Sequence, residues 1–254
     1  MQTITYRLYF RYLRSMNQQK NFKRIALLLI VLLTSSAVVL WATELKKHHR
    51  EATELKSIPS PLSVYSSLHL KELGLSASAF NLAVKGWEKL RANGEVSKNL
   101  ISICDFTQSS KNKRLYIIDL ASGKLLFNTL VAHGKNTGEE FAQSFSNQNA
   151  SNKSSLGFYV TKETYQGQHG LSLKLAGEEP GFNDHAEERS IVMHGADYVC
   201  ESFICQVGRL GRSFGCPSVP FELHNQIINT IKDGSCLFVY YPDAKYLHAS
   251  KLLR

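Results

Sequence analysis

The feature that most limits the fold is a change in apolar periodicity near residue 100. Beyond it, apolar and β-branched residues occur in short runs bounded by turn-forming residues, a pattern typical of β-strands. The two runs that flank ASGK predict a hairpin, and one helix is expected over ELHNQIINTIKDG. Further strands are expected in LISICDF, GFYVTKETYQ, LSLKLAG, SIVMHGA and SCLFVYY. The chain from residue 100 is therefore predicted to be mainly β, with few helices.

Before residue 100 the apolar residues follow a helical spacing instead. In SASAFNLAVKGWEKLRANGEV they recur at intervals of three and four behind a serine cap. The apolar face of this helix needs a partner, which favours a structural brace on the β-rich part. Two prolines in SIPSPLS mark a boundary ahead of it. The sequence thus predicts a linker at 43–66, a helical brace at 67–99 and the main, β-rich domain at 100–254.

The N-terminus combines a basic leader with an uncharged apolar segment. Residues 1–24 hold six basic residues and no acidic one, and residues 25–42 carry no charge over 18 residues. This length is at the lower limit for a helix that crosses a bilayer, and the basic flank keeps the N-terminus inside. An uncleaved transmembrane anchor, a cleaved signal peptide and a buried soluble helix are the three interpretations, in that order. The first two predict a periplasmic or extracytoplasmic domain, either anchored at the inner membrane or secreted.

Charge and cysteine content limit the partners and the redox chemistry. The formal net charge is +9, but without residues 1–24 the chain holds 24 basic and 21 acidic residues, or +3. No basic stripe interleaved with aromatic residues remains, so no nucleic-acid partner is expected. Five cysteines leave at least one thiol unpaired. Cys200 and Cys205 are close enough to form a disulfide if the chain bends between them, whereas Cys104 and Cys236 lie in apolar runs and are expected to be packed.

Cys216 is the candidate nucleophile. A thiol attacks carbonyls only as thiolate, so it needs a nearby base or positive field and some access. Cys216 stands between Gly215 and Pro217, which predicts a sharp turn, and Gly215 leaves room for an approaching substrate. His194, 22 residues upstream, ends the apolar run SIVM and is the candidate base at a strand end. Taken singly, a cysteine that fills a turn and a structural histidine are the simpler interpretations of each residue.

Together these residues carry a resemblance. The segment MHGADYV…GRLGRSFGCPSVP resembles the active-site signature of the murein L,D-transpeptidase catalytic-domain (YkuD-like) family. There a His–Gly pair precedes Ser or Thr, any residue, Gly and the nucleophilic Cys. The matching positions are His194, Gly195, Ser213, Gly215 and Cys216. SSLGFY and LYIIDLASGKLLFNTLVAHGKNTG are similar to other parts of the family's catalytic sheet, and the resemblance covers about residues 100–241.

The resemblance implies a fold, a reaction and residue roles. The fold would be a curved β-sandwich or barrel-like domain with few helices. Cys216 would attack the carbonyl that joins the third residue of a peptidoglycan tetrapeptide stem to its terminal D-alanine, while His194 takes the thiol proton. A carbonyl near Gly195 would orient the imidazole, and the N–H groups of Gly215 and Cys216 would hold the oxyanion. The thioester would pass to an amine of a neighbouring stem or to water, without a cofactor or a metal.

The chain departs from the family pattern at Phe214 and Ser218, where many members carry His and Asn or Arg. Arg209 and Arg212 are the candidate substrate-binding residues that compensate, because a guanidinium binds a carboxylate in a bidentate manner and peptidoglycan stems carry free carboxylates. Two solvated loop arginines are the alternative.

Two rival functions remain open at this level. A non-catalytic peptidoglycan-binding module anchored at the membrane is favoured by the missing polar groups near Cys216. A zinc peptidase would have to use histidines that lack a tight ligand spacing; they are His133, His169, His185 and His194. The rate of thiol alkylation at neutral pH separates a reactive Cys216 from an inert one.

Overall fold

The computed structural model describes residues 41, 46 and 60–254. The predicted leader at 1–24, most of the apolar segment at 25–42 and most of the linker at 43–66 lie outside the described residues. No helix of the described part is both long and apolar enough to cross a bilayer.

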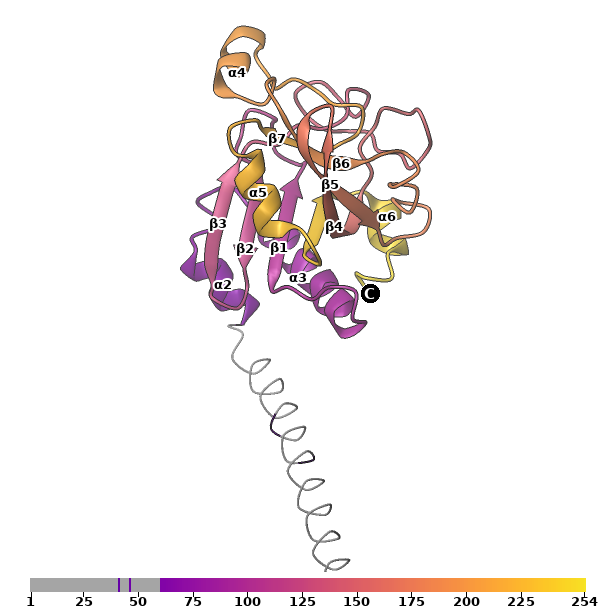
Figure 1. The fold of residues 1–254 in the computed structure, drawn as a ribbon. Coiled ribbons are helices and arrows are strands. Elements are labelled where there is room, and N and C mark those ends of the chain that lie inside the picture. Colours follow the sequence, from indigo (N-terminus) through magenta and orange to yellow (C-terminus); the bar gives the residue numbers. More distant parts are fainter. Residues whose placement is uncertain (1–40, 42–45, 47–59) are drawn as a thin grey trace, which may run out of the picture. The chain divides into compact units, whose positions relative to one another are not determined.

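Two helices precede the sheet (Figure 1). α2 (Pro61–Ser67) begins inside the range expected to be a linker, because the Ser60 hydroxyl accepts from the N–H of Ser63 and a proline occupies the first turn. α3 (Ala77–Ala92) is the predicted helical brace, and Ser76 caps it through the N–H of Ala79. Both helices bury apolar side chains in the same core as the sheet, so the folded unit begins before residue 67.

Gly86 allows α3 to lie directly on the sheet. A Cβ at this position would overlap the ring of Phe158, which stacks on Phe238 at a centroid distance of 4.1 Å. The apolar face of the helix, with Phe80, Trp87 and Leu90 fully or nearly buried, depends on that approach.

We expect Gly86→Ala to lower the free energy of unfolding by about 2 kcal/mol. Overpacking a core costs about 1–3 kcal/mol, and the gain in helix propensity returns at most about 1 kcal/mol. Urea unfolding followed by circular dichroism measures the change. Asn81→Ala on the exposed face of α3 is the matched control and should not destabilise the protein; equal stability of Gly86→Ala and the parent would contradict this packing.

Eight strands form one mixed sheet, in the order β3-β2-β1-β8-β4-β5-β6-β7. The predicted hairpin is confirmed as β2 and β3, which pair antiparallel, and the long hairpin of β4 and β5 follows it. The strands are β1 (Leu100–Asp105), β2 (Leu115–Asp119), β3 (Lys124–Thr129), β4 (Gly157–Gly167), β5 (Gly170–Gly177), β6 (Val192–Ala196), β7 (Ser218–Pro220) and β8 (Cys236–Tyr240).

The two ends of the sheet nearly meet. Ala132, just after β3, bridges to Ser218 of β7, and Gly134 bridges to Ser213. The sheet is thus a barrel-like layer that is almost closed. The prediction of a mainly β, barrel-like domain with few helices is confirmed.

Three short helices decorate the barrel. α5 (His224–Ile231) is the helix predicted from sequence; it buries three isoleucines against β5 and β6. α6 (Ala244–Ala249) is held by the buried carboxylate of Glu179, which accepts from Tyr246 at 2.8 Å and from Ser250. α4 (Glu201–Val207) stands out from the sheet in the β6–β7 connection (Figure 1).

The cysteines are all free thiols. Cys200 and Cys205 do not form the disulfide that was left open, because the segment between them is the helix α4, which directs the two side chains apart. Cys104 and Cys236 are fully buried on neighbouring strands of the core, as expected.

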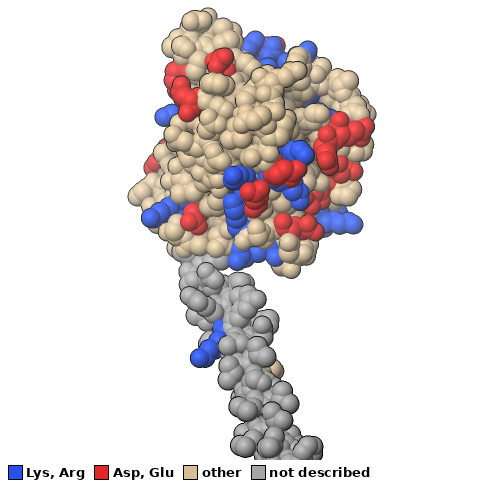
Figure 2. Space-filling model, in the orientation of Figure 1, with Lys and Arg blue, Asp and Glu red and all other residues tan. Residues whose placement is uncertain are grey.

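Acidic and basic side chains are interspersed on the face shown in Figure 2. Uncharged residues cover most of its upper part. This face carries no continuous basic stripe of the kind that binds nucleic acid.

Candidate active site

The crossover between β6 and β7 brings Cys216, just before β7, next to the strand that carries His194. β6 and β7 run parallel, with His194 opposite Ser218. Cys216 lies two residues before Ser218, next to the start of β6, where the N–H of Val192 points at the thiol with an N–S distance of 3.5 Å. His194 is the middle residue of β6 rather than its last, but its ring still lies at this edge of the sheet. Two residues that are 22 positions apart in the chain therefore share one site.

The hydrogen bonds of His194 define its tautomer. Nδ1–H donates to the carbonyl of Gly195 at 2.9 Å, so Nε2 is the acceptor and receives the hydroxyl proton of Ser218 at 3.0 Å. Gly195 is needed here because a Cβ would meet the His224 ring at 2.7 Å. The Nε2 lone pair of the imidazole thus faces β7, where the Ser218 hydroxyl occupies it in this conformation.

His194 is neutral near pH 7. Burial lowers the pKa of its imidazole, the bond to Gly195 O raises it, and the neighbouring His169 and His224 lower it again. His169, at the tip of the β4–β5 hairpin, stacks on His194 with ring centroids 4.4 Å apart. A neutral imidazole can accept a proton, so this environment suits a base.

Ser213 and Gly215 shape the nucleophile turn. The Ser213 hydroxyl donates to the carbonyl of Cys216 at 2.7 Å and accepts from the N–H of Gly215 at 3.1 Å. Gly215 has φ +131°, and a Cβ there would lie 2.8 Å from the carbonyl oxygen of Lys153. Only glycine fits this turn. The expectation that the Gly215 N–H holds an oxyanion needs correction, because in this conformation Ser213 already occupies that N–H.

The surroundings of Cys216 favour the protonated thiol over the thiolate. Burial raises its pKa, while the N–H of Val192 and the charge of Arg189 lower it, and the net direction is upward. The thiol points toward the carbonyl of Ser190 at 3.7 Å, and within the described chain it makes no hydrogen bond to His194. A protonated thiol reacts slowly, so the alkylation rate at neutral pH tests whether a base takes the proton of Cys216.

Arg189 is a cation at the site that sequence reasoning missed. Its Nη2 donates to the carbonyl of Lys153 at 2.7 Å, and Nη1 donates to Ser155 and to the carbonyl of Ser146. Among the described residues no carboxylate pairs with it. It therefore joins the segment before β6 to the loop before β4, and its positive charge acts on the nearby thiol.

Ser154 joins the same loop to the nucleophile turn. Its hydroxyl donates to the carbonyl of Gly215 at 3.1 Å and accepts from the N–H of Gly134 at 3.0 Å. Ser154 opens the SSLGFY segment, which was matched to the catalytic sheet without a role for the serine.

Arg209 and Arg212 both bind one carboxylate. Arg209 Nε lies 3.0 Å from one oxygen of Glu139, and Arg212 Nη1 lies 2.7 Å from the other. Arg212 also donates to the carbonyls of Lys135 and Gly138. A substrate carboxylate would have to take the place of Glu139.

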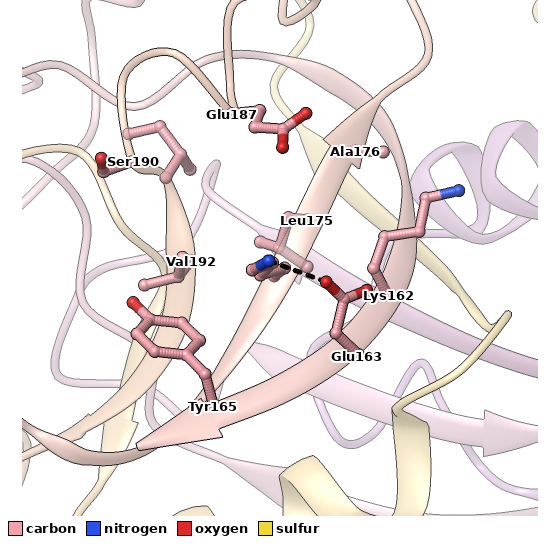
Figure 3. Close-up of a pocket in the computed structure, with 10 residues that line it drawn as sticks. Lys162, Glu163, Tyr165, Leu175, Ala176, Glu187, Ser190 and Val192 are labelled. Carbon is pink, nitrogen blue, oxygen red and sulfur yellow. Dashed lines mark hydrogen bonds and ion pairs between the residues drawn. The ribbon is translucent and has the colours of Figure 1, made fainter. Parts of the chain in front are cut away.

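A pocket of about 460 Å³ opens between the β4–β5 hairpin and residues 187–192 (Figure 3). Its wall includes Ser190 and Val192, the two residues whose backbone groups contact the Cys216 thiol. Lys162, Glu163, Lys174 and Glu187 bring both signs of charge to its rim. A peptide with amino and carboxylate groups would find partners there.

No group of three His, Cys, Asp or Glu side chains among the described residues is arranged to hold a metal ion. Of the four histidines considered for zinc, His133 uses both ring nitrogens, because Arg114 donates to Nδ1 at 2.7 Å and Nε2–H donates to Gly138 O at 3.1 Å. His169 and His194 stack on each other, and His185 is exposed.

No curated protein matches the sequence. Among solved structures, an L,D-transpeptidase from Mycobacterium smegmatis is similar at 11% identity and TM-score 0.34, over 56% of this chain and 59% of that one. The helical cell shape determining protein of Campylobacter jejuni is similar at 15% identity and TM-score 0.37, over 61% and 55%. The match to an L,D-transpeptidase from Stackebrandtia nassauensis has 14% identity and TM-score 0.34, over 67% and 73%.

This chain thus spans less than two thirds of the first two structures. A family model, described as the L,D-transpeptidase catalytic domain, matches residues 71–240. The match begins before the range assigned to the catalytic domain from sequence, so it includes α3. Since it covers more than half of the sequence, and the His–Gly and Ser-x-Gly-Cys positions fall within it, the chain belongs to the L,D-transpeptidase catalytic-domain family.

Proposed function

We propose that this protein is a cysteine-dependent acyltransferase that acts on peptidoglycan stem peptides. The observation that carries the proposal is the parallel β6–β7 pair, which sets the Nε2 lone pair of a neutral His194 on the edge where Cys216 turns. The activity is that of an L,D-transpeptidase when an amine accepts the acyl group, and of an L,D-carboxypeptidase when water does. No cofactor takes part. The domain acts outside the cytoplasm, either anchored by residues 25–42 or released by cleavage there.

The reaction proceeds in two steps. Cys216 Sγ attacks the carbonyl carbon between the third residue and the terminal D-alanine while its proton passes to His194 Nε2. The tetrahedral intermediate collapses, the C–N bond breaks, and His194 returns the proton to the leaving amine of D-alanine. The thioester is then attacked by the amine of a second stem, or by water, which restores the thiol.

The oxyanion accepts a hydrogen bond from the N–H of Cys216. Within the described chain, this N–H has no hydrogen-bond acceptor outside Cys216 itself. Arg189 adds a positive field that stabilises the developing charge on sulfur. The pocket of Figure 3 holds the donor stem, because its wall reaches the backbone around the thiol and its charges match the amino and carboxylate groups of a stem.

The test uses the full chain and a purified disaccharide tetrapeptide, with product masses read by liquid chromatography and mass spectrometry. The proposal expects release of D-alanine together with a cross-linked dimer or a tripeptide. A non-catalytic wall-binding module would instead retain the fragment without any change in its mass, and that result would overturn the proposal.

Arg212 gives a second check on the substrate. If a stem carboxylate takes the place of Glu139, Arg212→Lys should reduce kcat/KM roughly ten- to a hundredfold, because an ammonium lacks the planar fork. Arg209→Lys should cost less, since Arg209 is farther from Cys216 in the chain. The loss should shrink when the stem carboxylate is amidated, and Glu139→Gln should lower KM. Equal losses on acid and amide stems would mean that Arg212 only holds the loop through the carbonyls of Lys135 and Gly138.

A further inference from the structure

Two hydroxyl groups form a chain that ends on the base. Ser218 Oγ lies 3.0 Å from His194 Nε2, and Tyr198 Oη lies 3.2 Å from Ser218 Oγ. Since Nδ1 of His194 carries the ring proton, Ser218 donates to Nε2, and Tyr198 in turn donates to Ser218. Neither Ser218 nor Tyr198 is one of the signature residues, so the family pattern assigns no role to either hydroxyl.

Tyr198 is held in place by its surroundings. Its backbone carbonyl accepts from the N–H of Gly211 at 3.0 Å, and a Cβ on Gly211 would overlap the Tyr198 side chain. Ser218 is fully buried, whereas Tyr198 is half-buried. The two hydroxyls therefore link the buried imidazole to a half-buried tyrosine.

The hydrogen bond from Ser218 conflicts with the task of His194. Nε2 has one lone pair, and it cannot accept the Ser218 proton and the Cys216 proton together. Before His194 takes the thiol proton, the Ser218 hydroxyl has to rotate away from Nε2. The second hydrogen-bond partner of Ser218 Oγ in the described chain is Tyr198 Oη.

We propose that Ser218 and Tyr198 are positioning residues that switch His194 between its two protonation states. Ser218 donates to Nε2 while the imidazole is neutral, and it turns its proton to Tyr198 Oη when the imidazole takes the proton of Cys216. Tyr198 then turns its own proton away from Ser218, and Ser218 Oγ accepts from the new Nε2–H. The S–H bond breaks and the N–H bond forms, while both hydroxyls keep their protons. This proposal rests on the function proposed above.

The test is a double-mutant cycle on the full chain with two readouts. One is the pKa of His194 from the NMR shifts of its labelled imidazole. The other is the pH dependence of iodoacetamide alkylation at Cys216, mapped by mass spectrometry. Tyr198→Phe removes the alternative acceptor, so the Ser218 proton stays on Nε2 and opposes protonation of the imidazole. We expect Tyr198→Phe to lower the His194 pKa by about one unit and to slow alkylation below the thiol pKa roughly tenfold.

Repeating Tyr198→Phe in the background of a second substitution tests whether Tyr198 acts through Ser218. Once Ser218→Ala has removed the hydroxyl between the two rings, Tyr198→Phe should change neither readout by more than about twofold. In Ser218→Thr, which keeps the hydroxyl, the effect of Tyr198→Phe should persist. It should persist in Ser172→Ala as well, because this buried serine lies opposite His194 on β5 and bonds to Gly170 instead.

An unchanged pKa and alkylation profile in Tyr198→Phe would overturn the proposal, as would an equal effect in the Ser218→Ala background. If Ser218→Ala does not fold, loss of the Tyr198→Phe effect in Ser218→Thr overturns it. The remaining titratable groups that face the ring are His169, His224 and Cys216, and all are kept in every variant. Both readouts work without a stem peptide, so failure of the proposed acyl transfer is seen separately, in the product masses.

Discussion

Cys216→Ala should abolish acyl transfer to and from peptidoglycan stems. The covalent step needs a nucleophile on the sharp turn beside β6, and the four other thiols are elsewhere: two are fully buried and two flank or lie in α4. Loss of a catalytic nucleophile reduces kcat on the order of a thousandfold or more. Release of D-alanine from a tetrapeptide fragment measures the rate.

The matched controls are Cys200→Ala and Cys205→Ala, which remove one thiol at the start of the protruding helix α4 and one within it. Both should keep nearly full activity. Cys216→Ala should keep the fold, because alanine fits wherever the thiol does. Residual activity above a few per cent in Cys216→Ala, or its loss in either control, would mean that the nucleophile is misassigned.

His194→Ala should have the second-largest effect. General base catalysis contributes roughly a hundred- to ten-thousandfold, and Cys216, whose pKa is raised by burial, depends on a base to give up its proton near pH 7. Because burial and the neighbouring histidines lower the pKa of His194, the parent protein should lose activity only below about pH 6.5, the ordinary value for histidine. In His194→Ala this acidic limb should disappear, and the remaining rate should rise with pH as thiolate forms.

The exposed His185 provides the control, since His185→Ala removes an imidazole without touching the site. Its kcat/KM profile between pH 5 and pH 10 should overlay that of the parent. If the fall in activity below pH 6.5 keeps the same midpoint in His194→Ala, another group titrates there, and the role of His194 as base would be wrong.

The strands were predictable because most of them bury apolar residues in short runs between turn-forming residues. The hairpin around ASGK and the helix at α5 carry strong local patterns, and the structure confirms both. The family relationship was also predictable, since a His–Gly pair followed by Ser-x-Gly-Cys is a local pattern. His194 and Cys216 are 22 residues apart in the sequence, and the parallel pairing of β6 with β7 brings them to the same site.

Other parts of the site depend on contacts that leave no local pattern. Arg189 is held near the thiol by carbonyl groups of a distant loop, and any arginine in a loop has the same sequence signature. Tyr198 is linked to His194 only through Ser218. The sequence shows that Ser218 departs from the family pattern, but it does not show that Tyr198 is the partner of Ser218. The Gly215 N–H was expected to face a substrate, yet the nearby Ser213 hydroxyl competes for it.

The short helices α2 and α4 could not be predicted from the sequence for a related reason. α2 is short and begins at a proline in a segment that reads as a boundary, and α4 has the composition of a small loop with two cysteines. Short helices of this kind are fixed by capping and by tertiary contacts more than by periodicity.

The central claim is that Cys216 becomes acylated. The most direct measurement is the intact mass of the full chain after incubation with a carbapenem, whose strained acyl group traps such a thiolate as a stable adduct, followed by peptide mapping. The account predicts one added drug mass, located on the peptide that contains Cys216, and none in Cys216→Ala. An adduct on Cys200 or Cys205, or an unchanged mass when the same sample turns over stem peptides, would contradict it.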